Sequence, residues 1–260
     1  MSSDFIVFDG VFYLWYNCIM RSIVLAFLLC SCATSWHPTE DFEFVPVQAG
    51  RFDIATYQKF TDPRAEVHIY IEGDGHAFDG YGAPTDDPTP RSTLVRDLAM
   101  RDDAPNVVYM ARPCQFIMSP ACSETYWTDG RFSAAVLNSM SAAVTKVASG
   151  RPIVLVGYSG GAMVSGLIMK RNPALPVRKW ITIAGVLNHR DWTEYFGDAP
   201  LWRSLSPKHI PAVRALHYIG ENDETVPNEL SLRWINDPDT VVIVPNAGHE
   251  DFEDLEIDFN

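Results

Sequence analysis

The chain has 260 residues, of which 47% are hydrophobic and 20% are charged, a composition typical of folded globular proteins and not of disordered or fibrous ones. Its formal net charge is −13 and no segment is rich in Lys and Arg, so the phosphate backbone of a nucleic acid would be repelled rather than neutralised. The length suits one α/β domain with a substantial core, and the acidity is consistent with simple solubility.

The first expected element is a secretory signal over residues 20–31. A positive charge at Arg21 precedes an apolar run over residues 23–29, and small residues then lead to a cysteine, which is the order of regions in a signal peptide. The segment from Leu29 to Cys32 also resembles the lipobox of bacterial lipoproteins, which implies lipidation of Cys32. We therefore expect a protein of the bacterial cell envelope, attached by its lipid to the outer membrane and facing the periplasm.

Residues 1–19 fit this signal poorly, because two aspartates place negative charge where a signal begins with positive charge. We interpret them as an upstream over-call of the start, with translation beginning at Met20. The alternative is a membrane anchor over residues 11–29. Asn17 and Arg21 would then lie within the span, where a charged residue is costly.

After a polar linker expected over residues 32–41, short apolar runs alternate with helical patterns. Residues 42–47 and 52–57 predict an initial antiparallel pair of strands. Six further β-branched runs predict strands buried on both faces of a parallel sheet, at residues 67–71, 107–110, 153–156, 180–183, 215–219 and 241–244. Helical patterns lie between them at residues 93–100, 133–148 and 162–170. This alternation predicts a doubly wound α/β domain over residues 42–260.

Two segments interrupt the alternation. Residues 76–91 are rich in Gly, Pro and Asp, which predicts a surface loop. Residues 187–211 lie between two predicted strands, and we interpret them as a small cap over the site. The alternative is that their aromatic side chains pack a peripheral helix onto the core. These side chains are Trp192, Tyr195, Phe196 and Trp202.

Ser159 is the candidate catalytic nucleophile. It is the centre of the string Gly157-Tyr158-Ser159-Gly160-Gly161, between a predicted buried strand and a predicted helix. A serine hydroxyl is a weak nucleophile at neutral pH and needs a base, an orienting acid and donors for the oxyanion. In a strand–turn–helix context this string predicts a strained nucleophile elbow, whose neighbouring positions must be small.

Asp223 and His249 are the candidate acid and base. Asp223 lies in an acidic loop after the strand predicted at residues 215–219, although Glu221 and Glu224 are rivals by spacing alone. His249 follows the last predicted strand, and the resulting order of serine, acid and histidine differs from the orders of chymotrypsin and subtilisin. Five other histidines do not follow the last predicted strand and are weaker candidates for the base. His68 and His217 lie within predicted strands, and no positional argument favours His37, His189 or His209.

The oxyanion of an acyl-transfer reaction needs two backbone N–H donors. We expect one from Gly160 and the other from Asp74 or Gly75, in the glycine-rich loop after the strand predicted at residues 67–71. The alternative is a glycine turn that binds no ligand. A calcium site formed by Asp74, Asp79, Asp86 and Asp87 is a weaker hypothesis, because the spacing of these residues matches no calcium-loop pattern.

Cys114 and Cys122 form an even pair once the signal is removed and Cys32 is lipidated. An exported chain meets an oxidising compartment, which favours a disulfide between them. The alternative is two free, half-buried thiols, as expected for a cytosolic protein. Metal binding is disfavoured because no nearby histidine completes a ligand set.

With these residues in place, the chain resembles the α/β-hydrolase-fold, esterase-like lipoproteins of Gram-negative bacteria over nearly everything after the signal. The resemblance implies a mostly parallel sheet flanked by helices and a disulfide between Cys114 and Cys122. Arg112 is a candidate substrate contact together with His76 and Tyr158, although Arg112 and Gln115 would equally well pin their loop to the sheet. The resemblance rests on the elbow, on Gly248-His249 and on residues 70–75, 87–91, 111–115, 126–128 and 131–133.

These residues predict a serine hydrolase that cleaves a carboxylic ester of a small molecule or lipid through an acyl-enzyme, without a metal or an organic cofactor. One alternative is a peptidase or amidase that acts on envelope peptides, because the same triad serves both reactions. The other is a non-catalytic envelope lipoprotein that uses the fold for binding, although a binding module has no need of three triad residues.

Overall fold

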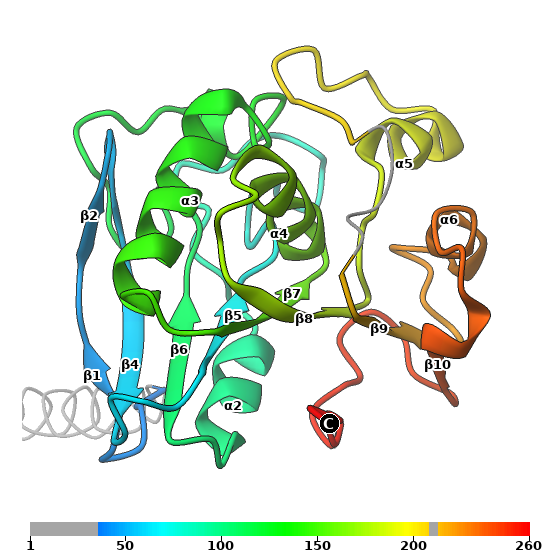
Figure 1. The fold of residues 1–260 in the computed structure, drawn as a ribbon. Coiled ribbons are helices and arrows are strands. Elements are labelled where there is room, and N and C mark those ends of the chain that lie inside the picture. Colours follow the sequence, from blue (N-terminus) through cyan, green and yellow to red (C-terminus); the bar gives the residue numbers. More distant parts are fainter. Residues whose placement is uncertain (1–35, 208–212) are drawn as a thin grey trace, which may run out of the picture. The chain divides into compact units, whose positions relative to one another are not determined.

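The computed structural model describes residues 36–207 and 213–260 of the chain (Figure 1). The predicted over-call at residues 1–19, the signal at 20–31, the lipidation site Cys32 and the end of the predicted cap at 208–211 lie outside the described residues. Within the described ranges, every helix is too short or too polar to cross a bilayer.

The described domain is built on an eight-stranded sheet with the strand order β1-β4-β6-β5-β7-β8-β9-β10. β1 and β4 pair antiparallel to each other, and β4 pairs antiparallel to β6, whereas every other neighbouring pair is parallel. The predicted α/β class is therefore confirmed. The strands are β1 (Glu43–Phe44), β4 (Thr56–Phe60), β5 (Val67–Ile71), β6 (Asn106–Met110), β7 (Ile153–Tyr158), β8 (Val177–Ile183), β9 (Ala215–Gly220) and β10 (Val241–Val244).

The antiparallel beginning differs in detail from the prediction. Residues 42–47 and 52–57 do pair antiparallel in a single register, as predicted, but the ladder is interrupted near Pro46 so that its two ends belong to different sheets. β1 pairs with β4, while β2 (Val47–Ala49) and β3 (Phe52–Ile54) form a separate two-stranded sheet. Pro46 lies between β1 and β2, and its lack of an N–H group prevents a continuous ladder at this point.

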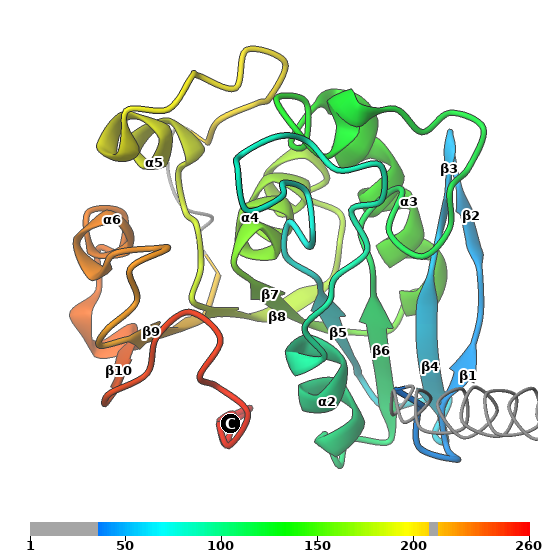
Figure 2. The same cartoon turned by 180° about the vertical axis from the view of Figure 1, so that it is seen from behind.

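Helices cover both faces of the large sheet (Figures 1 and 2). α3 (Ala134–Ala148) and α4 (Gly160–Arg171) lie on one face, and α2 (Leu94–Arg101) lies on the other, where the C-terminal segment also packs. The remaining helical elements are α5 (His189–Phe196), α6 (Asn228–Leu232), η1 (Glu124–Tyr126) and η2 (Pro238–Thr240).

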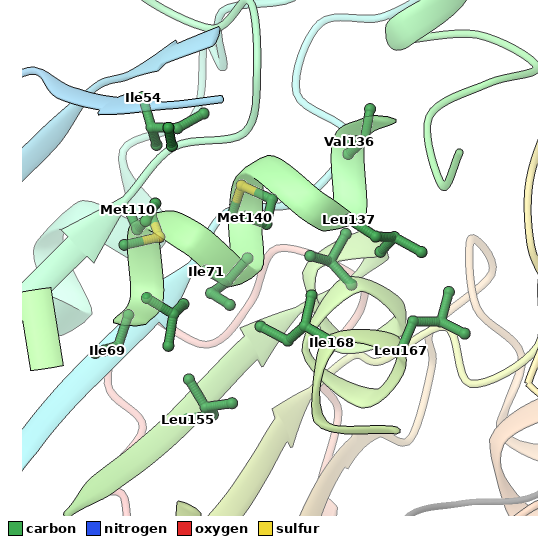
Figure 3. Packing of buried hydrophobic residues seen from close by; sticks show 14 of the residues in the cluster. Ile54, Ile69, Ile71, Met110, Val136, Leu137, Met140, Leu155, Leu167 and Ile168 are labelled. Atoms are coloured by element: carbon green, nitrogen blue, oxygen red, sulfur yellow. The ribbon is translucent and has the colours of Figure 1, made fainter. Parts of the chain in front are cut away.

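The two faces bury alternate residues of the same strands. Ile69 and Ile71 of β5 and Leu155 of β7 pack against α3 and α4 (Figure 3), whereas Tyr70 and Val156 face α2. Because successive side chains of a strand point to opposite faces, a strand covered on both sides must be apolar throughout. This requirement explains the continuous apolar runs in the sequence. Because these strands are parallel, the segments that follow β5, β6, β7, β9 and β10 begin at the same edge of the sheet.

Candidate active site

Ser159 lies on the turn between β7 and α4, with φ 49° and ψ −120°. A non-glycine residue in this region is strained, and such strain is characteristic of functional turns. The turn is possible because its neighbours are small: a Cβ at Gly157 would lie 2.6 Å from Cα of Ala162, and one at Gly161 would overlap the carbonyl oxygen of Ile71. The geometry is that of the predicted nucleophile elbow.

His249 links Ser159 to Asp223. Its Nε2 lies 3.0 Å from the Ser159 Oγ, and its Nδ1 lies 2.9 Å from the Asp223 Oδ2. The other carboxylate oxygen of Asp223 accepts hydrogen bonds from the backbone amides of Thr225 and Val226, at 2.9 and 2.8 Å. Asp223 is 5% exposed, so its carboxylate is fixed in orientation and shielded from water. The structure therefore brings the three predicted triad residues together in hydrogen-bonding order.

The two rival carboxylates lie elsewhere. Glu221 accepts a hydrogen bond from the Asn246 amide at 2.8 Å, and thereby ties the segment after β9 to the segment after β10. Glu224 is exposed on the surface of its loop. Of the three acids that spacing alone could not separate, Asp223 is thus the one that contacts the histidine.

The glycine-rich loop after β5 lies directly against the elbow. A Cβ added at Gly73 would lie 3.3 Å from Cβ of Ser159, and one added at Gly160 would overlap the carboxylate of Asp74. Within the described residues, no hydrogen bond occupies the backbone amides of Asp74 and Gly160. Gly75 also lines the cavity beside Ser159, and the close approach of the Pro88 carbonyl oxygen leaves no room for a Cβ at this position. Both predicted donors, Asp74 and Gly75, line the cavity beside Ser159.

Arg112 and Gln115 hold this loop from behind. The Arg112 guanidinium pairs with the Asp74 carboxylate and donates to the carbonyl oxygen of Arg131 at 2.5 Å. The Gln115 side chain accepts from the Arg112 amide at 2.8 Å and donates to the Gly73 carbonyl at 3.0 Å. Both side chains are buried. The prediction of Arg112 as a substrate contact is not supported by this position, which fits the alternative of pinning the loop.

The disulfide predicted between Cys114 and Cys122 is present, with the Cα atoms 5.7 Å apart. It closes the segment that follows β6, and Cys114 and Phe116 on either side of Gln115 both have positive φ values, 73° and 61°. The disulfide thus constrains the backbone that carries the loop-holding Gln115.

A cavity of about 370 Å³ opens beside Ser159. Two further predicted contacts, His76 and Tyr158, line it, and the Tyr158 hydroxyl donates to the His249 carbonyl oxygen at 3.0 Å. α5, within the predicted cap, contributes His189 and Trp192 to the same wall. The other lining residues are Glu72, Asp74, Gly75, Pro90, Arg91, Ser92, Arg131, Phe132, Val186, Thr225, Val226, His249 and Glu250.

Two features of this cavity were missed in the sequence. His189 was assigned no role, yet it is 2% exposed, stacks on Phe132 at 5.6 Å and lines the cavity. Burial, together with the nearby charge of Arg131, lowers the pKa of His189 to about 4, so it is neutral at neutral pH. Arg131 belongs to the segment 131–133 on which the family resemblance rests, but the sequence predicts no function for it. The sequence signal for both was weak, because they come together only in three dimensions.

The acidic residues of the loop do not form the calcium site considered above. Asp74 pairs with Arg112 and Arg131, and the side chain of Asp79 accepts hydrogen bonds from the amides of Tyr81 and Ala83 within its own turn. Among the described residues, no group of three or more His, Cys, Asp or Glu side chains is arranged to hold a metal ion.

Comparison with solved structures identifies the fold. An α/β serine hydrolase homologue from Coxiella burnetii superposes with a TM-score of 0.54 at 18% identity, covering 85% of this chain and 93% of its own. The chain has the α/β-hydrolase fold. A serine hydrolase from Cycloclasticus zankles gives a TM-score of 0.56 at 11% identity and coverages of 82% and 93%. A bacterial membrane phospholipase A superposes with a TM-score of 0.52 at 17% identity, covering 94% of this chain and 92% of its own. No protein-family model matches the sequence, and no curated protein matches it.

Proposed function

We propose that this α/β-hydrolase-fold protein is a serine hydrolase that cleaves carboxylic esters. The observation that carries this proposal is the position of His249, whose two ring nitrogens lie 3.0 Å from Ser159 Oγ and 2.9 Å from Asp223 Oδ2. A strained serine on a strand–helix turn, a histidine within reach of its hydroxyl and a buried carboxylate behind the histidine together form the arrangement that activates a serine.

In the proposed reaction, the imidazole with its proton on Nδ1 donates to Asp223, which leaves the Nε2 lone pair facing the Ser159 hydroxyl. Nε2 takes the hydroxyl proton as Oγ attacks the ester carbonyl, and the carbonyl oxygen becomes an oxyanion. In this proposal the backbone amides of Gly160 and of Asp74 or Gly75 donate to that oxyanion, near the start of α4, where the helix dipole also favours negative charge.

The tetrahedral intermediate then collapses, and the leaving alcohol takes the proton from His249 Nε2, which leaves an acyl-Ser159. A water molecule attacks this ester while giving its proton to the same Nε2, and the carboxylic acid departs with Ser159 restored. Asp223 stabilises the imidazolium in both halves of the cycle, because its second oxygen stays fixed by the amides of Thr225 and Val226.

The test is the hydrolysis of a matched pair of substrates, 4-nitrophenyl butyrate and butyryl 4-nitroanilide, by wild type and Ser159→Ala. We expect turnover of the ester by the wild type and a loss of at least about a thousandfold in kcat for the serine variant. Preferential cleavage of the anilide would identify an amidase. Absence of any serine-dependent turnover across esters of graded acyl length would identify a binding protein.

We further propose that the protein is lipid-anchored to the envelope through Cys32. Support comes from the order of charge, apolar run and cysteine in the sequence, since this residue lies outside the described part of the chain. Incorporation of radiolabelled palmitate should occur in the wild type and be lost in Cys32→Ala, with Cys30→Ala as the matched control. Labelling that survives Cys32→Ala contradicts the proposed anchor.

A further inference from the structure

Arg131 is a buried cation in the wall of the candidate active site. It is 5% exposed, lines the cavity beside Ser159, and lies in the segment that links η1 to α3. Its guanidinium lies among three aromatic rings, 5.7 Å from the centroid of Phe132 and 5.9 Å from those of Phe78 and Trp192. These contacts hold the guanidinium in place between the loop after β5 and α5.

The charge of Arg131 is only partly compensated. Its Nε pairs with Asp74 Oδ2 at 2.8 Å, but the same carboxylate also pairs with the buried guanidinium of Arg112. Two positive charges therefore share one negative charge. Burial opposes the ionisation of Asp74, but the two arginines outweigh it and hold the pKa of this carboxyl below its usual value. In a protein whose net charge is −13, the cluster of Asp74, Arg112 and Arg131 carries an excess of one positive charge.

The neighbouring acid forms no ion pair with Arg131 within the described residues. Glu72 also lines the cavity, but its carboxylate is 4% exposed and accepts hydrogen bonds from Tyr109 and from the Gly73 amide. Burial raises the pKa of Glu72, while the hydrogen bonds from Gly73 and Tyr109 and the charges of Arg96 and Arg112 act in the opposite direction. Burial and the charge of Arg131 lower the pKa of His189 to about 4, so this histidine contributes no charge at neutral pH.

The excess charge lies close to the reacting atoms. The Asp74 carboxylate abuts Gly160, the residue after the nucleophile, so Arg131 is separated from the elbow by the width of one carboxylate. At the rim of the same cavity, Arg91 is exposed and forms no ion pair within the described residues, while Glu250 is the one exposed acid of the lining. The inner wall is thus more positive than the rim.

We propose that the substrate carries an anionic group, a carboxylate or a phosphate, within a few bonds of the ester carbonyl, and that Arg131 binds it. This inference rests on the proposed function, since it names the class of ester that the site takes. A buried guanidinium that shares its counterion gains a second one when such a substrate binds, and a charge-assisted hydrogen bond in a water-poor pocket is strong and directional. A neutral ester offers no such gain, so the site selects for charge.

Two pairs of synthetic esters test this selection on either side of the carbonyl. On the acyl side, mono-4-nitrophenyl adipate is compared with its methyl ester. On the alcohol side, 3-acetoxybenzoate is compared with methyl 3-acetoxybenzoate, and release of the phenol is followed in every case. We expect the anionic member of at least one pair to have a kcat/KM higher by about tenfold or more, with most of the difference in KM. Its KM should rise with salt more than that of the neutral member.

Variants assign the preference to Arg131. Arg131→Gln should abolish the preference for the anionic member, and Arg131→Lys should retain part of it. The control variant is Arg64→Gln, which should leave the preference unchanged because Arg64 is exposed and does not line the cavity. Wild-type preference for the neutral member of both pairs overturns the inference, as does an unchanged preference in Arg131→Gln. If Arg131→Gln does not fold, the wild-type ratios and their salt dependence decide. The proposed function fails separately, if no ester of either pair is cleaved.

Discussion

The Tyr109 hydroxyl donates a hydrogen bond to Glu72 Oε2 at 2.8 Å, and both side chains are buried. The other carboxylate oxygen of Glu72 accepts a hydrogen bond from the Gly73 amide at 2.9 Å. Gly73 directly precedes Asp74, whose carboxylate lies against Gly160 of the elbow. The pair therefore ties the loop after β5 to β6. Burial raises the pKa of Glu72, and these two hydrogen bonds act in the opposite direction.

Tyr109→Phe should destabilise the protein by about 1–3 kcal/mol, because it leaves a buried carboxyl oxygen without its donor. The measurement is the free energy of unfolding in urea at pH 7. Tyr81→Phe is the matched control, since Tyr81 is 99% exposed and its hydroxyl is hydrated. Equal unfolding free energies for the two variants would show that the contact between Tyr109 and Glu72 contributes nothing.

Two buried histidines predict a loss of stability in mild acid. Burial lowers the pKa of His217 to about 4, and burial with the charge of Arg131 does the same for His189. An unfolded histidine takes up a proton below about pH 6.5, while the folded one stays neutral until about pH 4. The free energy of unfolding therefore falls as the pH is lowered through this window, by at most about 3 kcal/mol per histidine.

Urea titrations at several values between pH 7 and pH 4 measure this slope. His217→Gln should be less sensitive to acid than the wild type, whereas the exposed His37→Gln should keep the wild-type slope. A wild-type stability that does not change between pH 6.5 and pH 4 contradicts the assignment of both histidines as buried and neutral.

Gly161→Ala should abolish folding or reduce stability by several kcal/mol, because the added methyl group would overlap the backbone carbonyl oxygen of Ile71 and neither backbone can yield cheaply. Gly80→Ala is the matched control, since a Cβ there meets no atom within 4 Å. Soluble yield and thermal unfolding compare the two. A Gly161→Ala protein as stable as Gly80→Ala would show that the elbow is not as tightly packed as described.

Removal of the disulfide by the paired change Cys114→Ser and Cys122→Ser should lower stability by about 2–3 kcal/mol, the value expected for closing a loop of this length. Ester turnover should also fall, because Gln115 within the loop holds the Gly73 carbonyl beside the elbow. Urea unfolding and kcat are measured on the same preparation. Unchanged values of both would make the disulfide irrelevant to the site.

The sequence predicted the parts of the site that depend on local context. Ser159 could be placed because its small neighbours and the flanking strand and helix adjoin it in the chain. His249 could be placed by its position after the last strand. The choice of Asp223 over Glu221 and Glu224 needed three dimensions, because only the direction of each side chain separates them.

The charge arrangement of the cavity could not be predicted in the same way. Asp74, Arg112 and Arg131 come from three separate segments, and nothing in the spacing of these residues indicates that two arginines share one carboxylate. The same holds for His189, whose place in the wall depends on how α5 packs over the elbow. The antiparallel pairing of the first two segments was predicted correctly, but the interruption that divides this hairpin between two sheets was not.

Reaction of the wild-type protein with a fluorophosphonate probe, followed by mass spectrometry of the modified peptide, tests the activated serine most directly. The account predicts one adduct, on Ser159, that forms rapidly in the wild type and is absent from Ser159→Ala. His249→Ala should prevent it as well, because the base is removed while the serine remains. Failure of the wild type to react, or labelling that persists in Ser159→Ala, would contradict the assignment of Ser159 as the nucleophile.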